Sequence, residues 1–79
     1  MLVRIKLIDI FRDFLPPGTD VSNFKLELQN NAVVHDIFST LDIPDDLPRV
    51  ILCNGKFAKK EQRLSDGDVI AIFSPIFGG

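Results

Sequence analysis

Residues 24–41 read FKLELQNNAVVHDIFSTL, and the spacing of their apolar residues changes halfway along. From Phe24 to Gln29 apolar and polar residues alternate, which is typical of a strand that buries one face. Farther on, apolar residues recur at i, i+3, i+4 and i+7, a spacing that gives a helix one apolar stripe. These helix positions are Val34, Ile37, Phe38 and Leu41. We therefore expect a strand followed at once by a helix, with Asn30 or Asn31 as its cap and Pro44 as its end.

Three further stretches are predicted to be strands: Leu2–Ile8, Val50–Leu52 and Val69–Phe73. The first alternates, and the other two are short apolar runs of the kind found in buried strands. The dipeptide Asn54-Gly55 tolerates positive φ at both positions, so we expect a tight turn there. Asp66-Gly67-Asp68 predicts a second turn just before the last strand.

The order of elements is strand, strand, helix, strand, strand, with a further short strand left open between residues 56 and 63. One helix packed on one face of a mixed sheet is an α+β architecture. The order favours a β-grasp, or ubiquitin-like, fold as a single domain over residues 1–73. Pro75 cannot donate to a strand ladder, so residues 74–79 are predicted to form a flexible, extended tail.

The composition limits the classes of function. The chain has 79 residues, 46% of them hydrophobic, which is enough for one core but not for a fold with an active-site cleft of ordinary size. A net charge of −2 with both signs interspersed gives no reason to expect nucleic acid or a membrane as partner. The single Cys53 excludes an internal disulfide and a multi-cysteine metal site, and fits a reducing compartment. We therefore expect a cytoplasmic protein, without a bound metal or cofactor, on which other proteins act.

The sequence ends in Gly78-Gly79. A carboxylate that another enzyme must handle has to enter a narrow channel, and glycine has no Cβ to obstruct entry. The alternative is a frayed terminus or a cloning scar. Fully extended, residues 74–79 would reach about 20 Å, which is long enough to enter a partner's pocket.

The last sixteen residues, Leu64–Gly79, resemble the end of the MoaD/ThiS sulfur carriers. Those proteins have a leucine, an Asp-Gly-Asp turn, an apolar strand and a short tail that closes in Gly-Gly. Asn54-Gly55 lies where they carry an Asn-Gly-type turn, Val33–Leu41 is similar to their helix, and Arg12 follows the first strand as an arginine often does there. The resemblance spans the whole chain.

The resemblance implies that an ATP-dependent adenylating enzyme activates the carboxylate of Gly79. The acyl-adenylate is then converted to a thiocarboxylate that donates sulfur to a biosynthetic acceptor. ATP would be used by that partner and not bound by this chain. Whether the chain counts as an enzyme is left open, because it would be a carrier or a subunit that supplies the thiocarboxylate.

Within the family, the tail is most similar to that of the small subunit of molybdopterin synthase. Phe73, Pro75, Ile76, Gly78 and Gly79 match its pattern. Ser74 replaces a proline and Phe77 replaces a small residue. The expected acceptor is the large subunit of molybdopterin synthase, although thiamine synthesis, tRNA thiolation and other sulfur-transfer pathways stay open.

Apolar residues in polar settings are candidates for partner binding. Ile8 shares a strand face with Arg4 and Lys6, Phe57 lies among lysines, and Phe73 alternates away from its isoleucine neighbours. In the small subunits of molybdopterin synthase the matching positions dock the partner, so we expect Ile8, Phe57, Phe73 and the tail residues Pro75, Ile76 and Phe77 to do so here. The alternative is that Ile8 and Phe73 fold back into a minor cluster.

Other polar residues are given structural interpretations. His35 is expected to be solvated on the helix, Cys53 to be a packed thiol, and Asp66 and Asp68 to be turn residues. The basic run Lys56, Lys59, Lys60 and Arg63 predicts a solvated loop, with an acidic groove on an activating enzyme as the alternative.

Two other functions stay open. A ubiquitin-like modifier would be joined to target lysines through Gly79 by the same activation chemistry. A plain interaction module would make the Gly-Gly end incidental.

Overall fold

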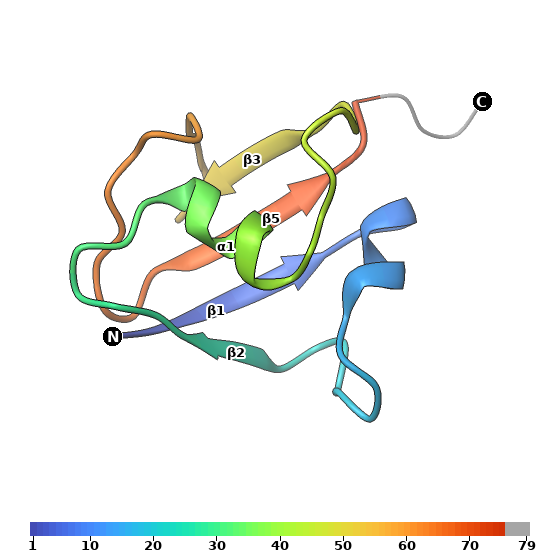
Figure 1. The fold of residues 1–79 in the computed structure, drawn as a ribbon, viewed down its shortest axis with the longest axis horizontal. Coiled ribbons are helices and arrows are strands. Elements are labelled where there is room, and N and C mark those ends of the chain that lie inside the picture. The colour runs from blue at the N-terminus through green and yellow to red at the C-terminus, as the bar shows by residue number, and fades with distance from the viewer. Residues whose placement is uncertain (76–79) are drawn as a thin grey trace.

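The computed structural model describes residues 1–75 and shows a five-stranded mixed sheet with an α-helix on one of its faces (Figure 1). Strand β1 (Leu2–Leu7) pairs antiparallel with β2 (Phe24–Glu27) and parallel with β5 (Val69–Phe73). Strand β3 (Val50–Cys53) pairs antiparallel with β5 and with the two-residue β4 (Lys56–Phe57). The order β2-β1-β5-β3-β4 puts the first and last strands side by side at the centre, and the predicted α+β architecture is confirmed.

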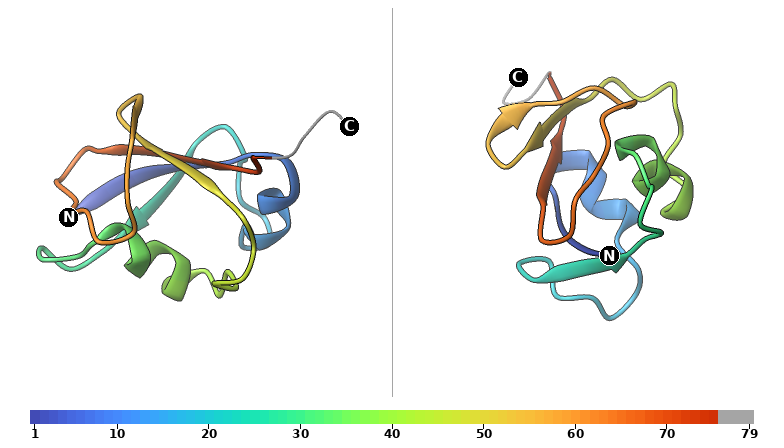
Figure 2. Two further views of the ribbon diagram at one scale, coloured as in Figure 1. Left: turned by 90° about the horizontal axis from the view of Figure 1, so that it is seen from above. Right: turned by 90° about the vertical axis from the view of Figure 1, so that its left-hand side faces the viewer.

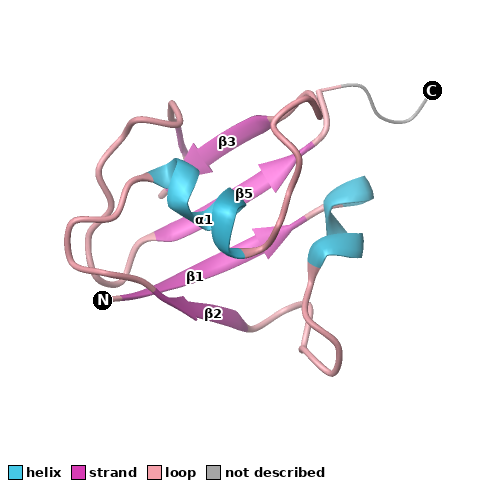
Figure 3. Ribbon diagram, viewed as in Figure 1, coloured by secondary structure: helices cyan, strands magenta, loops and turns pink. Residues whose placement is uncertain are grey.

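Helix α1 (Val34–Thr40) crosses one side of the sheet, as the turned views in Figure 2 show. Its buried residues Val34, Ile37 and Phe38 are three of the four predicted from the apolar spacing, and Leu41 is half-buried. Long loops connect the helix to its neighbours in the chain (Figure 3). Among residues 1–75, no helix has the length and apolar character needed to cross a membrane.

The start of α1 differs from the prediction, because neither Asn30 nor Asn31 caps it. The N-cap is Val33, whose backbone N–H donates to the Asp36 carboxylate at 2.8 Å. The first free N–H groups of the helix, on Val34 and His35, donate to backbone carbonyl oxygens of residues 62 and 60, each at 2.9 Å. The loop that leads to β5 thus satisfies donors that a capping side chain would otherwise take.

The end of α1 also comes earlier than Pro44. The helix ends at Thr40, and Asp42 then adopts a φ of 57°, a left-handed conformation that turns the chain away from the helix axis. Pro44 follows this reversal and does not cause it.

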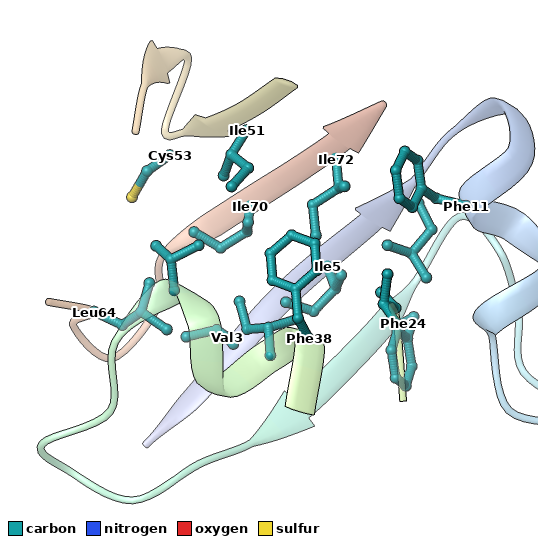
Figure 4. Close-up of a cluster of buried hydrophobic side chains, with 14 residues drawn as sticks. Val3, Ile5, Phe11, Phe24, Phe38, Ile51, Cys53, Leu64, Ile70 and Ile72 are labelled. Carbon is teal, nitrogen blue, oxygen red and sulfur yellow. The ribbon is translucent and has the colours of Figure 1, made fainter. Parts of the chain in front are cut away.

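The core lies between α1 and the sheet (Figure 4). Val3, Ile5 and Leu7 of β1 point into it, next to Ile70 and Ile72 of β5, and none of the five exposes more than 2% of its surface. Because successive strand side chains point to opposite faces, the alternate residues of both strands must lie on the other side of the sheet.

A short 3-10 helix, η1 (Asp9–Phe14), was not predicted from the sequence. It follows β1 directly, and its Phe11 is completely buried at the end of the core (Figure 4). The ring of Phe11 lies 6.4 Å from that of Phe14, in a tilted arrangement.

The turn before β5 is locked by side chains, and the interpretation of Asp66 and Asp68 as turn residues is confirmed. The Asp68 carboxylate accepts hydrogen bonds from the Ser65 backbone N–H at 2.8 Å and from Asn54 Nδ2 at 2.9 Å. Asp66 accepts one from the Leu2 N–H at 2.7 Å. Gly67 has a φ of 87°, which favours glycine. These bonds tie the start of β5 to both β1 and the β3–β4 turn.

The β3–β4 turn also has the predicted geometry. Asn54 and Gly55 have φ values of 53° and 85°, so both central positions are left-handed. Asn54 Oδ1 accepts a hydrogen bond from the Val69 N–H at 2.9 Å, which joins this turn to β5.

We predict that Phe11→Ala lowers the free energy of unfolding by about 3–5 kcal/mol, because it leaves a cavity under η1. Phe57→Ala is the matched control. Its side chain is 84% exposed, and its change should stay within about 0.5 kcal/mol. Urea denaturation followed by circular dichroism measures both, and equal losses would contradict the burial of η1.

Stability should also depend on pH through Asp68. Hydrogen bonds, first from the Ser65 N–H and then from Asn54, hold the pKa of the Asp68 carboxyl below its ordinary value. Such a group stabilises the fold above its unfolded pKa, and this stabilisation is lost as pH falls through the lower folded pKa. We predict that the free energy of unfolding falls between about pH 5 and about pH 3.

In Asp68→Ala the fall with pH should be smaller when urea denaturation is repeated over this range. It should not vanish, because a Ser22 hydrogen bond lowers the pKa of Asp20 and a His35 hydrogen bond lowers that of Asp45. Asp13→Ala, which removes an exposed carboxylate of η1, is the control and should follow the wild type. An unchanged slope in Asp68→Ala would argue against the locked turn.

Candidate functional site

The side of the sheet away from α1, here called the outer face, carries apolar residues at its centre. Ile70 and Ile72 of β5 are fully buried against the helix side, so Val69, Ala71 and Phe73 project the other way. All three are half-buried. The prediction that Phe73 alternates away from its isoleucine neighbours is thus confirmed, and Phe73 belongs to the outer set.

Cross-strand pairing brings the apolar residues of neighbouring strands together on this face. Phe73 pairs with Val50, Ala71 pairs with Leu52, and Leu52 pairs with Phe57. Residues directly opposite in a sheet point to the same side and contact one another. A continuous apolar strip therefore runs across β5, β3 and β4.

Ile8 joins this strip from the end of β1. It follows the buried Leu7 with extended backbone, φ −120° and ψ 153°, and its N–H donates to the Ile72 carbonyl oxygen at 3.0 Å. Alternation therefore carries its side chain to the outer face next to Phe73, where it is 37% exposed. We call this set the docking patch, and its members are Ile8, Val50, Leu52, Phe57, Ala71 and Phe73.

The structure thus brings together the three body residues predicted for partner binding, Ile8, Phe57 and Phe73. Phe57 is the most exposed, at 84%. The sequence analysis did not single out Val50, Leu52 and Ala71, because they belong to two runs that were predicted to be buried strands. The strand register places them in one strip with Phe57 and Phe73. Their alternation with the buried Ile51 and Cys53 was the available signal. That the patch binds a partner stays a prediction.

The chain leaves the sheet at the same end as this patch. Strands β1 and β5 are parallel, so Ile8 and Phe73 both lie where these central strands end, beside η1 (Figure 1). After Phe73, Ser74 is buried and Pro75 is exposed. The remaining predicted site residues, Ile76, Phe77, Gly78 and Gly79, lie outside the described residues.

Cys53 is a packed thiol, as predicted. It exposes 7% of its surface, and its Sγ lies 3.6 Å from Asp68 Oδ2, to which it donates. Burial, with the nearby Asp68 charge, raises the pKa of the Cys53 thiol. The thiol is therefore kept protonated and is a poor nucleophile.

His35 has a partner that the sequence did not reveal. Its Nε2 lies 2.9 Å from Asp45 Oδ1, and its Nδ1 lies 3.5 Å from Ser39 Oγ. The reversal at Asp42 brings Asp45 back to the first turn of α1, so the expectation of a simply solvated His35 is corrected. These contacts tie the loop after α1 to the helix, on the side of the molecule away from the docking patch. The Asp45 and Ser39 side chains are exposed there.

Residues 1–75 contain no group of three or more His, Cys, Asp or Glu side chains placed to hold a metal ion. What these residues offer is an apolar face beside the point where the chain leaves the sheet.

Comparison with solved structures finds this fold in proteins of distant sequence. SAMP1 from Haloferax volcanii has a TM-score of 0.75 at 19% identity, over 100% of both chains. A putative molybdopterin converting factor, subunit 1, from Pyrococcus furiosus has a TM-score of 0.73 at 25% identity, over 95% of this chain and 98% of that one. A chain of the complex of subunits 1 and 2 of the molybdopterin-converting factor from Helicobacter pylori has a TM-score of 0.61 at 22% identity, over 100% of both. The predicted ubiquitin-like β-grasp fold is confirmed.

Comparison with curated protein sequences finds no match. The family model of the ThiS family matches residues 10–79, which takes in all but the first residue of η1, as well as α1, the turn at Gly67, the strand β5 and the Gly78-Gly79 end. With a fold shared by ThiS/MoaD-like sulfur carriers and ubiquitin-like modifiers, the chain belongs to the ThiS family.

Proposed function

We propose that this chain is a sulfur carrier whose C-terminal Gly79 is adenylated and then converted to a thiocarboxylate. The observation that carries the proposal is the docking patch, which lies at the end of the sheet where the family-matched segment leads on to Gly78-Gly79. A carrier needs a surface that a partner can grip and a chain end that the partner can reach. The docking patch and the point where the chain leaves the sheet after Phe73 lie at one end of the fold, which supports the proposal.

The chemistry of the carrier requires little of the chain itself. The Gly79 carboxylate attacks the α-phosphorus of ATP bound to the partner, and pyrophosphate leaves. A sulfur nucleophile then displaces AMP from the acyl-adenylate. Gly78 and Gly79 contribute by lacking a Cβ, so that the end fits a narrow channel. The catalytic groups belong to the partners.

Molybdopterin synthesis is the pathway that we propose for the sulfur. The likeness to the putative molybdopterin converting factor subunit of Pyrococcus furiosus, at 25% identity, supports it. Phe73 and Pro75 also fit the tail pattern of small subunits of molybdopterin synthase, whereas Ser74 and Phe77 depart from it. The partners would be an adenylating enzyme and the large synthase subunit, in the cytoplasm, where the unpaired Cys53 stays reduced.

Conjugation to protein lysines is the alternative, since the same acyl-adenylate serves both chemistries. The fold likeness to SAMP1 fits either function. The two differ in the nucleophile that finally attacks the carbonyl of Gly79, and the product tells them apart.

We predict that the purified chain, incubated with the adenylating enzyme of the same organism, ATP and a sulfur donor, gains the mass of an oxygen-to-sulfur exchange at Gly79. Intact-mass and fragment spectra measure this gain. A chain lacking Gly79 should gain nothing while keeping the circular dichroism spectrum of the wild type. A branched Gly-Gly linkage on lysine would assign the chain to the modifiers, and an unmodified carboxylate would exclude both functions.

Phe73→Asp should weaken binding to the large synthase subunit by about 30-fold, because it puts a charge at the centre of an apolar contact. Val21→Asp, the same type of change on an exposed loop residue, is the matched control and should bind as the wild type does. Calorimetry measures the affinity and thermal unfolding measures the stability. If Phe73→Asp unfolds the chain to the extent that it loses binding, Phe73 serves the core instead.

A further inference from the structure

Two basic side chains face each other on the outer face, next to the docking patch. Arg4 of β1 and Lys25 of β2 are directly opposite in the antiparallel register. Both are exposed, and both alternate with buried neighbours such as Ile5 and Phe24. Like charges directly opposite in a sheet destabilise it, so the fold alone gives no reason for this pair.

A third cation extends the pair toward the patch. Lys6 lies two residues beyond Arg4 on the same face, and it pairs in register with Ala71, a member of the docking patch. Within residues 1–75 no carboxylate lies within ion-pair distance of Arg4, Lys6 or Lys25. The one ion pair among these residues joins His35 and Asp45, elsewhere in the fold. Even Glu27, on the same face of β2, is not paired with them.

The Arg4–Lys25 pair borders a hollow in the surface. It has a volume of about 380 Å³, and the residues around it include Leu2, Arg4, Lys25, Asp66, Gly67 and Val69. The Asp66 carboxylate is turned to the Leu2 N–H at 2.7 Å and forms no ion pair with either cation. Val69 lies on the same strand and face as Ala71 and Phe73, so the hollow and the docking patch form one surface.

We propose that a carboxylate side chain of the docking partner occupies this hollow, between Arg4 and Lys25. This inference rests on the proposed function, since it concerns the partner that covers the docking patch. The partner surface it describes is apolar at its centre and carries an aspartate or glutamate on one side. A carboxylate there would offset the repulsion that the free chain carries.

The position of the hollow also orients the partner. Arg4 pairs with the first residue of β5, whereas Ile8 and Phe73 lie at the other end of the same two strands. The acidic residue of the partner therefore lies on the side away from the channel that receives Gly79. A reversed docking would place that acid over Ile8 and Phe73 and leave the cations uncovered.

An acidic protein surface fits these cations better than nucleic acid does. The chain has a net charge of −2, and the three cations lie between Glu27 and the apolar docking patch, whereas nucleic-acid sites track phosphates with long basic stripes. The partner class to be tested is therefore protein.

The variant Lys25→Glu separates binding from folding, because it puts an opposite charge across from Arg4. Its melting temperature should equal or exceed that of the wild type. Its affinity for the large synthase subunit and for the adenylating enzyme of the same organism should fall about tenfold or more. The affinity should also depend less on salt than that of the wild type. Lys59→Glu, the same charge change on an exposed loop residue, is the matched control and should bind the large synthase subunit as the wild type does.

Calorimetry at low and high salt gives the affinities, and each outcome decides. Loss of affinity in Lys25→Glu alone supports the carboxylate site. Wild-type affinity in Lys25→Glu, or equal losses in both variants, overturns it while leaving the proposed function intact. Wild-type protein that binds neither partner overturns the proposed function and this inference with it. Tight binding of a single-stranded oligonucleotide, lost in Lys25→Glu, would assign the cations to nucleic acid and overturn the inference.

Discussion

The parallel register of β1 and β5 is the constraint on which the rest of the structure depends. Ile5 is paired with Ile70, and Leu7 with Ile72, so four large side chains point together into the core. A slip of β5 by one residue would turn Ile70 and Ile72 to the other face. The same register sets the outer face, because Arg4, Lys6 and Ile8 then lie beside Val69, Ala71 and Phe73. The pairing of β1 with β5 therefore positions both the core and the docking patch.

That pairing joins the two ends of the chain, and local structure holds it in place. The Asp68 carboxylate and the Asn54 side chain link the start of β5 to the β3–β4 turn, while Asp66 accepts the Leu2 N–H at the start of β1. Each of these hydrogen bonds joins residues at least 14 positions apart in the sequence. The turn at Asp66–Asp68 is thus the point at which three strands are brought into register.

Much of the fold could be predicted from the sequence, because it follows from local periodicity. Alternation gave β1, β2 and the outward position of Phe73, and the helical spacing gave the buried face of α1. What the sequence could not predict depends on residues far apart in the chain. The donors at the start of α1 are satisfied by carbonyl groups of residues 60 and 62, His35 meets Asp45 across a loop, and Arg4 meets Lys25 only through the strand register.

The helix η1 was missed for another reason: it is a short 3-10 helix with a single buried residue, Phe11, and shows no periodic pattern.

The strand β4 has only two residues and ends the sheet on the side of Phe57. An open sheet edge is a template on which a second chain can add a strand, and an apolar face beside it makes such addition more favourable. A two-residue edge offers too few free N–H and C=O groups to hold a neighbour, and β2 at the opposite edge is short and carries Lys25. A carrier of the proposed kind would spend time unbound between two enzymes with its apolar face uncovered. The short edge strands β2 and β4 disfavour aggregation of the unbound chain through strand addition.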